Sequence, residues 1–309
     1  AFNNKSSAER FLFTCYSFVP EHGKIGTDPG MDVGDEVWYY SDNSADYSNK
    51  TTFWIAKGMQ NSNEPLVDYW NGAQWGKAMF VGIRDCNVFI ENIDKVPDLS
   101  AYDKETWKAE AKVLKAFYHF WMMRMYGPIP IIKENIPVSA GEDEVRVVRD
   151  KIDDIVTYIV SLIDESVEYL PLNIQNEAAE MGRITRPAAK AIKAKILAFA
   201  ASPFFNGNLD YANFKNAEGD PFFNQVYDNE KWAKAADACL EAIQCAEEAG
   251  HGLYEFVNMS STQLSDETIL SLSNHCKVTE RWNKELVWGC GQSGIRDLQV
   301  LCQPWLESN

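Results

Sequence analysis

Positive charge is scarce in this sequence. Its 309 residues include 29 Lys and Arg against 45 Asp and Glu, which gives a net charge of −16 at pH 7. A chain this acidic repels phosphate backbones and anionic lipid. The densest positive stretch, Lys190 to Lys195, only spaces three lysines along an alanine-rich segment. We therefore expect no nucleic-acid partner and no direct electrostatic binding to a membrane surface.

Long apolar runs and paired cysteines are missing as well. No stretch reaches the roughly 18 consecutive apolar residues of a membrane-spanning helix, and Ala1 to Lys5 has neither the basic nor the apolar region of a signal peptide. The seven cysteines contain no C-x-x-C and leave one over when paired, so they indicate neither a disulfide framework nor a zinc site. Apolar residues make up 46% of the chain, enough for a buried core.

Familiar catalytic patterns are also absent. The sequence has no H-E-x-x-H, no G-x-S-x-G and no phosphate-binding Gly-Lys-Ser/Thr loop. His119 lies in an aromatic helical stripe, where a packed core residue is commoner than a base, and His275-Cys276 lacks further ligands at metal spacing. The three acidic residues between positions 32 and 36 do not by themselves indicate a glycosidase, because loop spacing cannot place two carboxyl groups across a sugar. We expect no catalytic residue, metal or cofactor.

Helical periodicity is the dominant pattern that is present. Apolar residues recur at three- and four-residue steps, with caps such as Asp103 and Thr185 and a stop at Gly127-Pro128. The alanines between 188 and 200 allow close helix packing. The sequence predicts a single, mostly α unit with little β structure: a solenoid of helix pairs with long aromatic-rich loops. The expected elements are helices at about 6–18, 65–93, 103–126, 150–170, 187–202 and 229–249, and a short strand at 285–288.

Tryptophans within the helical patterns are expected to serve the core. Trp107, Trp121 and Trp232 each fall in an apolar helical stripe, and Trp70 falls in the predicted helix at 65–93. Trp75, five residues after Trp70, would point to another side of that helix, and its role stays open.

The connection from Pro20 to Asn63 has a different composition. It is rich in Gly, Asp, Asn and Ser, and connections this long tend to be functional. It carries Trp38-Tyr39-Tyr40, then Asp42-Asn43, and later Trp54. Aromatic rings stack on the C–H face of a pyranose, while Asn and Asp side chains hydrogen-bond to its hydroxyl groups. Three consecutive aromatic side chains cannot all point inward from an extended segment. At least one should face solvent or ligand; alternatively, they pack the loop onto the solenoid.

Several segments carry a family likeness. Glu110 to Trp121, continuing through Arg124 to Pro130, resembles the long helix of the SusD/RagB family, the surface glycan-binding lipoproteins of Bacteroidetes-type bacteria. The likeness continues in the family's order over most of the chain. The further matching segments are Gly182 to Thr185, Ala200 to Gly207, Tyr227 to Ala236 and Asn283 to Val287.

The resemblance implies a fold, a location and a partner. It implies tetratricopeptide-like helix pairs, with residues 1–309 forming one SusD-like N-terminal helical domain whose lipid-anchored leader and C-terminal half lie outside this chain. It places the protein at the cell surface on the outer membrane, held by that N-terminal lipid, beside a SusC-like TonB-dependent transporter. It also implies two aromatic faces for a glycan. The ligand-binding residues expected on this basis are Trp38, Tyr39, Tyr40, Asp42, Asn43, Trp54 and Trp305.

Three functional hypotheses follow. The first is a non-catalytic protein that captures an oligosaccharide or polysaccharide and delivers it to the transporter. The second is a glycan-active enzyme of the helical-barrel type, with the aromatic residues lining its cleft. The third is a helix-repeat scaffold that binds other proteins and uses its aromatic residues structurally. New reducing ends after incubation with glycans would separate the second hypothesis from the first.

Overall fold

The computed structural model describes residues 2–21, 30, 33–34, 54–74 and 76–290. Within these ranges the secondary structure is helical, and the only β pairing is three isolated bridges. The main helices are α1 (Lys5–Tyr16), α4 (Met79–Asn92), α5 (Ala101–Tyr126), α7 (Ile152–Asp164), α9 (Arg186–Ala201), α10 (Glu230–Glu248) and α11 (Asp266–Thr279). The short elements are η1 (Ile93–Lys95), α6 (Glu142–Val145), η2 (Val167–Tyr169), α8 (Glu177–Glu180) and η3 (Leu209–Tyr211).

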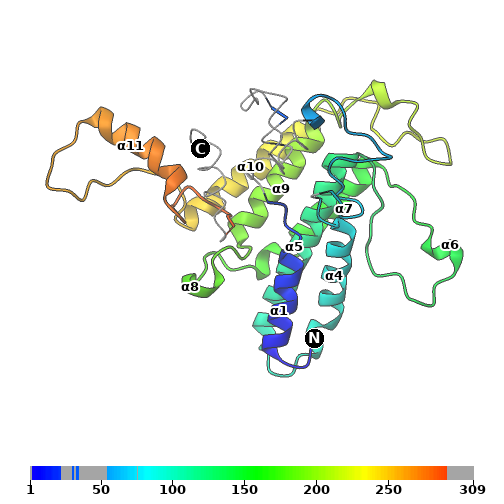
Figure 1. Ribbon diagram of the computed structural model, residues 1–309, viewed down its shortest axis with the longest axis horizontal. Helices are drawn as coiled ribbons and strands as arrows, with labels where there is room; N and C mark the ends of the chain where they lie inside the picture. The colour runs from blue at the N-terminus through cyan, green and yellow to red at the C-terminus, as the bar shows by residue number, and fades with distance from the viewer. Residues whose placement is uncertain (1, 22–29, 31–32, 35–53, 75, 291–309) are drawn as a thin grey trace, which may run out of the picture.

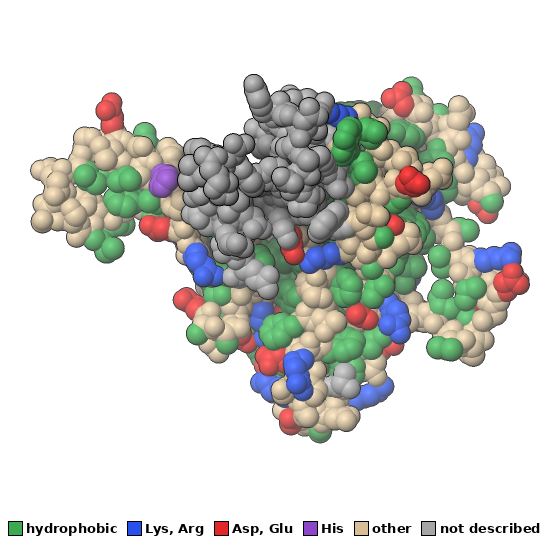
Figure 2. All heavy atoms as spheres, in the orientation of Figure 1, with side chains coloured by type: hydrophobic (Ala, Val, Ile, Leu, Met, Phe, Trp, Pro, Cys, Tyr) green, Lys and Arg blue, Asp and Glu red, His purple; other side chains and the backbone are tan. Residues whose placement is uncertain are grey.

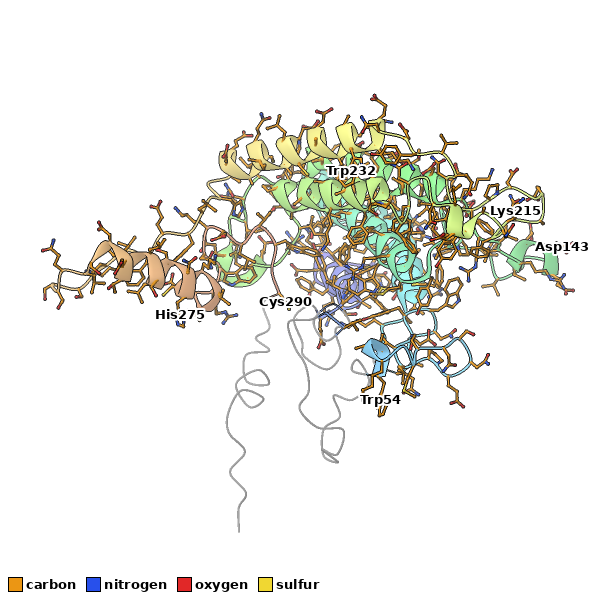
Figure 3. The ribbon with its side chains drawn as sticks, turned by 90° about the horizontal axis from the view of Figure 1, so that it is seen from above. Trp54, Asp143, Lys215, Trp232, His275 and Cys290 are labelled. Carbon is orange, nitrogen blue, oxygen red and sulfur yellow. The ribbon has the colours of Figure 1, made fainter. Side chains whose placement is uncertain are left out.

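Successive helices pack against each other in chain order. α4 packs on α1 and α5, α5 on α7, α7 on α9, and α9 on α10 (Figure 1). The expected stack of helix pairs is therefore confirmed. α11 stands apart from this stack, none of its residues is buried, and Figure 3 shows His275 on it, far from Trp54.

The core is centred on α5. Ser100, and not the predicted Asp103, caps this helix by accepting from the Asp103 backbone N–H, and Gly127 ends it with a positive φ of +70°. Other helices cover α5 on several sides, so Tyr118, Phe120 and Trp121 are almost completely buried. Such a helix needs apolar side chains around most of its circumference, and α5 has them.

His119 is a packed core residue, as the sequence predicted. It is fully buried; its Nδ1 donates to the Lys115 carbonyl oxygen at 2.8 Å, and its Nε2 accepts from the Ile132 N–H at 3.2 Å. Burial lowers the pKa of His119 to about 4, so the ring is neutral at pH 7. The Lys115 ammonium is also buried and donates to the Lys133 carbonyl oxygen at 2.6 Å.

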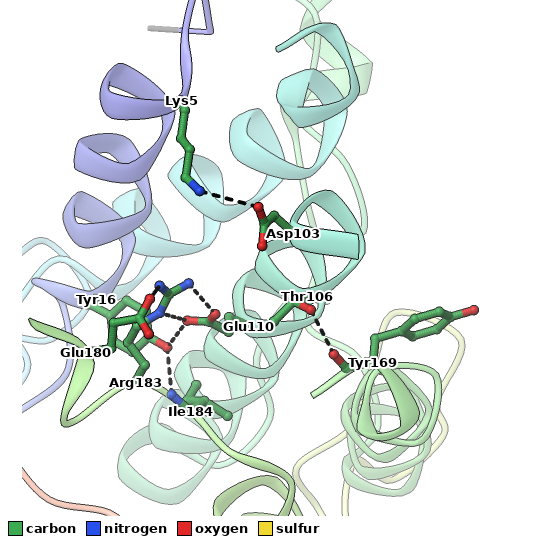
Figure 4. Close-up of polar contacts among 9 residues, drawn as sticks. All are labelled: Lys5, Tyr16, Asp103, Thr106, Glu110, Tyr169, Glu180, Arg183 and Ile184. Carbon is green, nitrogen blue, oxygen red and sulfur yellow. Dashed lines mark hydrogen bonds and ion pairs between the residues drawn. The ribbon is translucent and has the colours of Figure 1, made fainter. Parts of the chain in front are cut away.

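A buried ion pair connects α1, α5 and the segment before α9 (Figure 4). Arg183 donates twice to Glu110, from Nη2 at 2.6 Å and from Nε at 3.2 Å. The Tyr16 hydroxyl donates to Glu110 Oε2 at 2.5 Å and accepts from the Ile184 N–H at 2.9 Å. Burial raises the pKa of Tyr16 well above its usual range, so the phenol stays protonated. The hydrogen bonds of Glu110 and Tyr16 thus join α1, α5 and the segment before α9.

Two predicted elements are wrong. The helix expected at 65–93 begins only at Met79, because residues before it form a tight turn with positive φ at Gly72 and Gln74. The strand expected at 285–288 is a turn, in which the Trp288 indole N–H donates to the Gly182 carbonyl oxygen at 3.0 Å. In both segments side-chain hydrogen bonds and packing favour turns over the regular element that the apolar residues suggested.

The prediction that Trp232 is a core residue is also wrong. Trp232 is 42% exposed, and Leu240 and Ile243 on the same side of α10 are more exposed still. α10 packs on α9 through a different side, made of small residues that let the two helices approach closely. That buried side consists of Ala235, Ala238, Ala242 and Cys245.

Candidate functional site

Three connections meet at one end of the helix stack. The segment before α4, the α5–α7 connection and the α9–α10 connection all lie where α5 ends (Figure 1). They touch one another: the Arg149 guanidinium lies 5.3 Å from the Trp70 ring centroid, and Phe223 Cζ would lie 3.2 Å from a Cβ placed on Gly127. We call this region the loop end.

Trp54 lies in one of these connections. It begins a single helical turn, is partly exposed, and has the Lys57 ammonium 4.8 Å from its ring centroid. The segment is fixed to the chain that follows by the Gln60 side chain, whose Nε2 donates to the Val67 carbonyl oxygen at 3.0 Å and whose Oε1 accepts from the Leu66 N–H at 2.6 Å. Figure 3 shows Trp54 projecting from this segment on the side of the molecule away from α10.

The turn formed by residues 68–74 holds a second described tryptophan, Trp70. The Asp68 carboxylate, only 5% exposed, accepts from the backbone N–H groups of Trp70 and Asn71 at 2.9 and 3.0 Å and from Asn71 Nδ2 at 2.8 Å. Gly76 closes the turn so tightly that a Cβ there would lie 2.0 Å from the Asp68 carbonyl oxygen. The turn therefore presents its side chains from a fixed backbone.

Trp70 joins this turn to the core. Its ring packs edge-on against Phe80 and Tyr126, with centroids 4.9 and 5.6 Å apart, and the Tyr126 hydroxyl accepts from the Tyr69 N–H at 2.9 Å. The core role predicted for Trp70 holds, although part of its ring stays accessible. The side chains of Asn71 and Gln74 are exposed beside it. The loop end thus combines aromatic faces with amide groups, the chemistry that pyranose rings and their hydroxyl groups require.

The structure describes only one of the predicted ligand-binding residues, Trp54. Trp38, Tyr39, Tyr40, Asp42, Asn43 and Trp305 lie outside the described residues, as do Trp75 and the acidic residues 32, 35 and 36. The sequence prediction missed the Trp70–Gln74 turn as a surface feature. The Asn71-Gly72 pair, a common turn signal, could have indicated it.

Within the described ranges, no group of three or more His, Cys, Asp or Glu side chains could hold a metal ion. Among the described helices, none has both the length and the apolar character needed to cross a membrane. On the face seen in Figure 2, Lys and Arg side chains are scattered among acidic ones, in keeping with the acidic composition.

The fold and the loop end define a class: a helix-pair protein with aromatic and amide side chains displayed at one end. Residues 25–197 match the family model SusD-like_3, described as starch-binding and associating with the outer membrane. The match spans more than half of the chain, and the chain belongs to this SusD-like family. The family predicted from the sequence is confirmed.

Individual relatives agree with this assignment. A SusD-like protein of Bacteroides ovatus (strain ATCC 8483) is 31% identical over 99 residues, which cover 32% of this chain and 16% of the relative. The solved structure of BT4246 superposes with a TM-score of 0.74 at 29% identity, over 95% of this chain and 51% of that one. A laminarin binding SusD-like protein shares the fold, with a TM-score of 0.56 at 17% identity over 93% of this chain and 51% of its own. The chain spans about half the length of these two solved relatives.

Proposed function

We propose that this protein binds an oligosaccharide or polysaccharide at the cell surface without cleaving it and delivers it to a SusC-like TonB-dependent transporter. The observation that carries the proposal is the loop end, where Trp54 and the Trp70 turn are held in place on the fold of a starch-binding family. A rigid aromatic surface loses little conformational entropy on binding. Weak stacking contacts with a sugar can therefore give measurable affinity.

The proposed placement follows the family. We infer that residues 1–309 act as the N-terminal helical domain of a lipoprotein held on the outer membrane by an N-terminal lipid. With its net charge of −16 the chain has no general attraction to anionic lipid, so the anchor and the transporter would supply all membrane contact. Holding the binder next to the transporter raises the effective ligand concentration there, which compensates for weak single sites.

Binding and turnover can be tested together. The protein is titrated calorimetrically with maltohexaose, laminarihexaose and mannohexaose, and each mixture is assayed for new reducing ends. We expect binding of at least one hexasaccharide and no increase in reducing ends. Trp54→Ala should weaken binding, while Trp232→Ala should not, because it removes a partly exposed tryptophan at the start of α10 that Figure 3 shows on the opposite side of the molecule from Trp54.

Two outcomes would contradict the proposal. New reducing ends would favour the glycan-active enzyme, and no binding to any of the three hexasaccharides would favour the protein-binding scaffold. The transporter partnership is tested separately, by detergent extraction of the native protein from outer membranes. Co-purification with a TonB-dependent transporter is expected, and a preparation without one would leave a stand-alone binder.

A further inference from the structure

The α9–α10 connection, residues 202–229, is long but firmly built. Asn206 is 2% exposed and joins the two ends of the connection: its Nδ2 donates to the Asp228 carbonyl oxygen and its Oδ1 accepts from the Asp228 N–H, both at 2.8 Å. Between these ends, the Asp220 carboxylate pairs with the Lys151 ammonium at 2.7 Å. A connection whose ends are joined and whose interior is fixed by a further contact can hold its other side chains in defined positions.

Four aromatic rings are ordered within this connection. Tyr211 stacks on Phe223 at 4.8 Å and 23°, and Phe223 lies nearly parallel to Phe205 at 6.1 Å and 13°. Phe204 packs edge-on against all three, with centroids 4.9 to 5.7 Å away. Phe205 and Phe223 are buried, whereas Tyr211 is 40% and Phe204 48% exposed. Tyr211 is therefore the outer member of a supported stack, and no described ring covers its other face.

Two polar side chains of the same connection accompany the ring stack. The Asp210 side chain is exposed next to Tyr211. The Gln225 side chain braces the connection, because its Nε2 donates to the carbonyl oxygens of Asn208 and Phe223 at 3.0 and 2.8 Å. Its Oε1 is buried and has no hydrogen-bond partner among the described residues. Since a ligand cannot reach this buried oxygen, the polar group here that can accept from a sugar hydroxyl is the exposed Asp210 carboxylate.

We propose that Tyr211, flanked by Phe204, is a second carbohydrate-contact platform that stacks on a pyranose ring of an uncharged glycan. A sugar ring presents a flat C–H face about as large as one aromatic ring. A single exposed ring at the end of a stack therefore fits a sugar better than it fits the broad apolar surface of another protein. The nearby Asp210 carboxylate and the acidic character of the chain disfavour uronic acids and sulfated sugars.

The platform is physically connected to the Trp70 turn. Phe223, the second ring of the stack, packs over Gly127, and the preceding residue Tyr126 contacts Trp70. Both surfaces thus rest on the end of α5, and one glycan chain of several residues could contact both. Two weak contacts on one chain would raise affinity with chain length. This extends the proposed function to a second surface, and the inference rests on glycan binding as its general premise.

Tyr211→Ala is the direct test, with Tyr227→Ala as the matched control. Tyr227 is 57% exposed in the same connection but takes no part in the ring stack. Each variant is titrated with the hexasaccharides used above and with the corresponding disaccharides. We expect Tyr211→Ala to weaken hexasaccharide binding by about 5- to 10-fold, the loss of one aromatic stacking contact. Tyr227→Ala should bind like the wild type, and Tyr211→Phe, which keeps the ring, should bind within about 2-fold of it.

Structural damage is monitored by the thermal unfolding of each variant and by the NMR signals of labelled tyrosine rings. In the wild type, the Tyr211 ring signals should shift on addition of hexasaccharide and the Tyr227 signals should not. Hexasaccharide binding that is unchanged in Tyr211→Ala, with no shift of the Tyr211 signals, overturns the platform and leaves the proposed function intact. Absence of binding in the wild type overturns the proposed function itself and the platform with it.

Discussion

Glu110 and Arg183 are 73 residues apart in sequence and form a two-bond ion pair inside the protein, with exposed side-chain fractions of 2% and 8%. The opposite charge of Glu110 and its hydrogen bonds raise the pKa of Arg183 despite the opposing effect of burial. The guanidinium also lies 5.3 Å from the Trp107 ring centroid and binds Glu180 at 2.7 Å. One side chain thus connects α5 to the segment that leads into α9.

Removing one partner of this buried ion pair should destabilise the protein. We expect Arg183→Met to lower the free energy of unfolding by about 3–5 kcal/mol, because Glu110 would stay buried without its counter-ion. The control is Glu165→Gln, which breaks the largely exposed ion pair with Lys112 and should cost at most about 1 kcal/mol. Urea unfolding of both variants measures the difference, and equal losses would argue against a structural role for the buried pair.

Stability should depend on His119 in mildly acid solution. The pKa of His119 is lowered to about 4 in the folded protein, against about 6.5 for an unfolded chain. As the pH falls from 6.5 to 4, His119 binds a proton in the unfolded chain but not in the folded protein. The neutral ring therefore contributes stability that is present above pH 6.5 and is lost toward pH 4, up to about 3 kcal/mol.

The His119 contribution is separated from that of the carboxylates by a variant. His119→Gln keeps an acceptor near the Ile132 N–H but cannot titrate. The free energy of unfolding of the wild type, measured between pH 4 and 7, should fall more steeply than that of this variant. Parallel curves would show that His119 is protonated in the folded protein as readily as in the unfolded one.

Loop and core tryptophans should respond differently to truncation. Trp54→Ala, and likewise Trp38→Ala and Tyr40→Ala in the predicted site, should weaken oligosaccharide binding and shift the melting temperature only slightly. Trp121 is 1% exposed, and Trp121→Ala should cost about 3–5 kcal/mol of stability. Calorimetric titration and thermal unfolding of the same samples give both quantities. Unchanged affinity in all three loop variants would place the binding surface elsewhere.

The two sides of α10 offer a test of how it packs. Ala238 faces α9 and is 5% exposed, so Ala238→Leu should overpack the contact and cost about 1–3 kcal/mol. Trp232→Ala, on the other side, should cost about 1 kcal/mol or less, because much of that ring is already in water. Denaturant unfolding compares them, and a larger loss for Trp232→Ala would mean that the tryptophan serves the core after all.

The helices were predictable from sequence because their signals are local. The patterns at 103–126, 187–202 and 229–249 correspond to helices at Ala101–Tyr126, Arg186–Ala201 and Glu230–Glu248. Apolar spacing, a capping side chain and a terminating glycine or proline act within a few residues of one another. The family motifs are likewise contiguous, so the family and the helix-pair fold could both be recognised before any contact was known.

The surfaces were decided by tertiary structure. Periodicity shows that Trp232 shares a stripe with other apolar residues, but only the Ala-lined contact with α9 determines which stripe of α10 is buried. Trp70 became part of a turn because Asp68 binds the following backbone and Tyr126, 56 residues further along the chain, packs on the ring. The Tyr211 ring stack forms because the chain folds back and brings Phe223 against both Phe205 and Tyr211. Burial depends on which distant residues come into contact, and the spacing of residues along the chain does not determine those contacts.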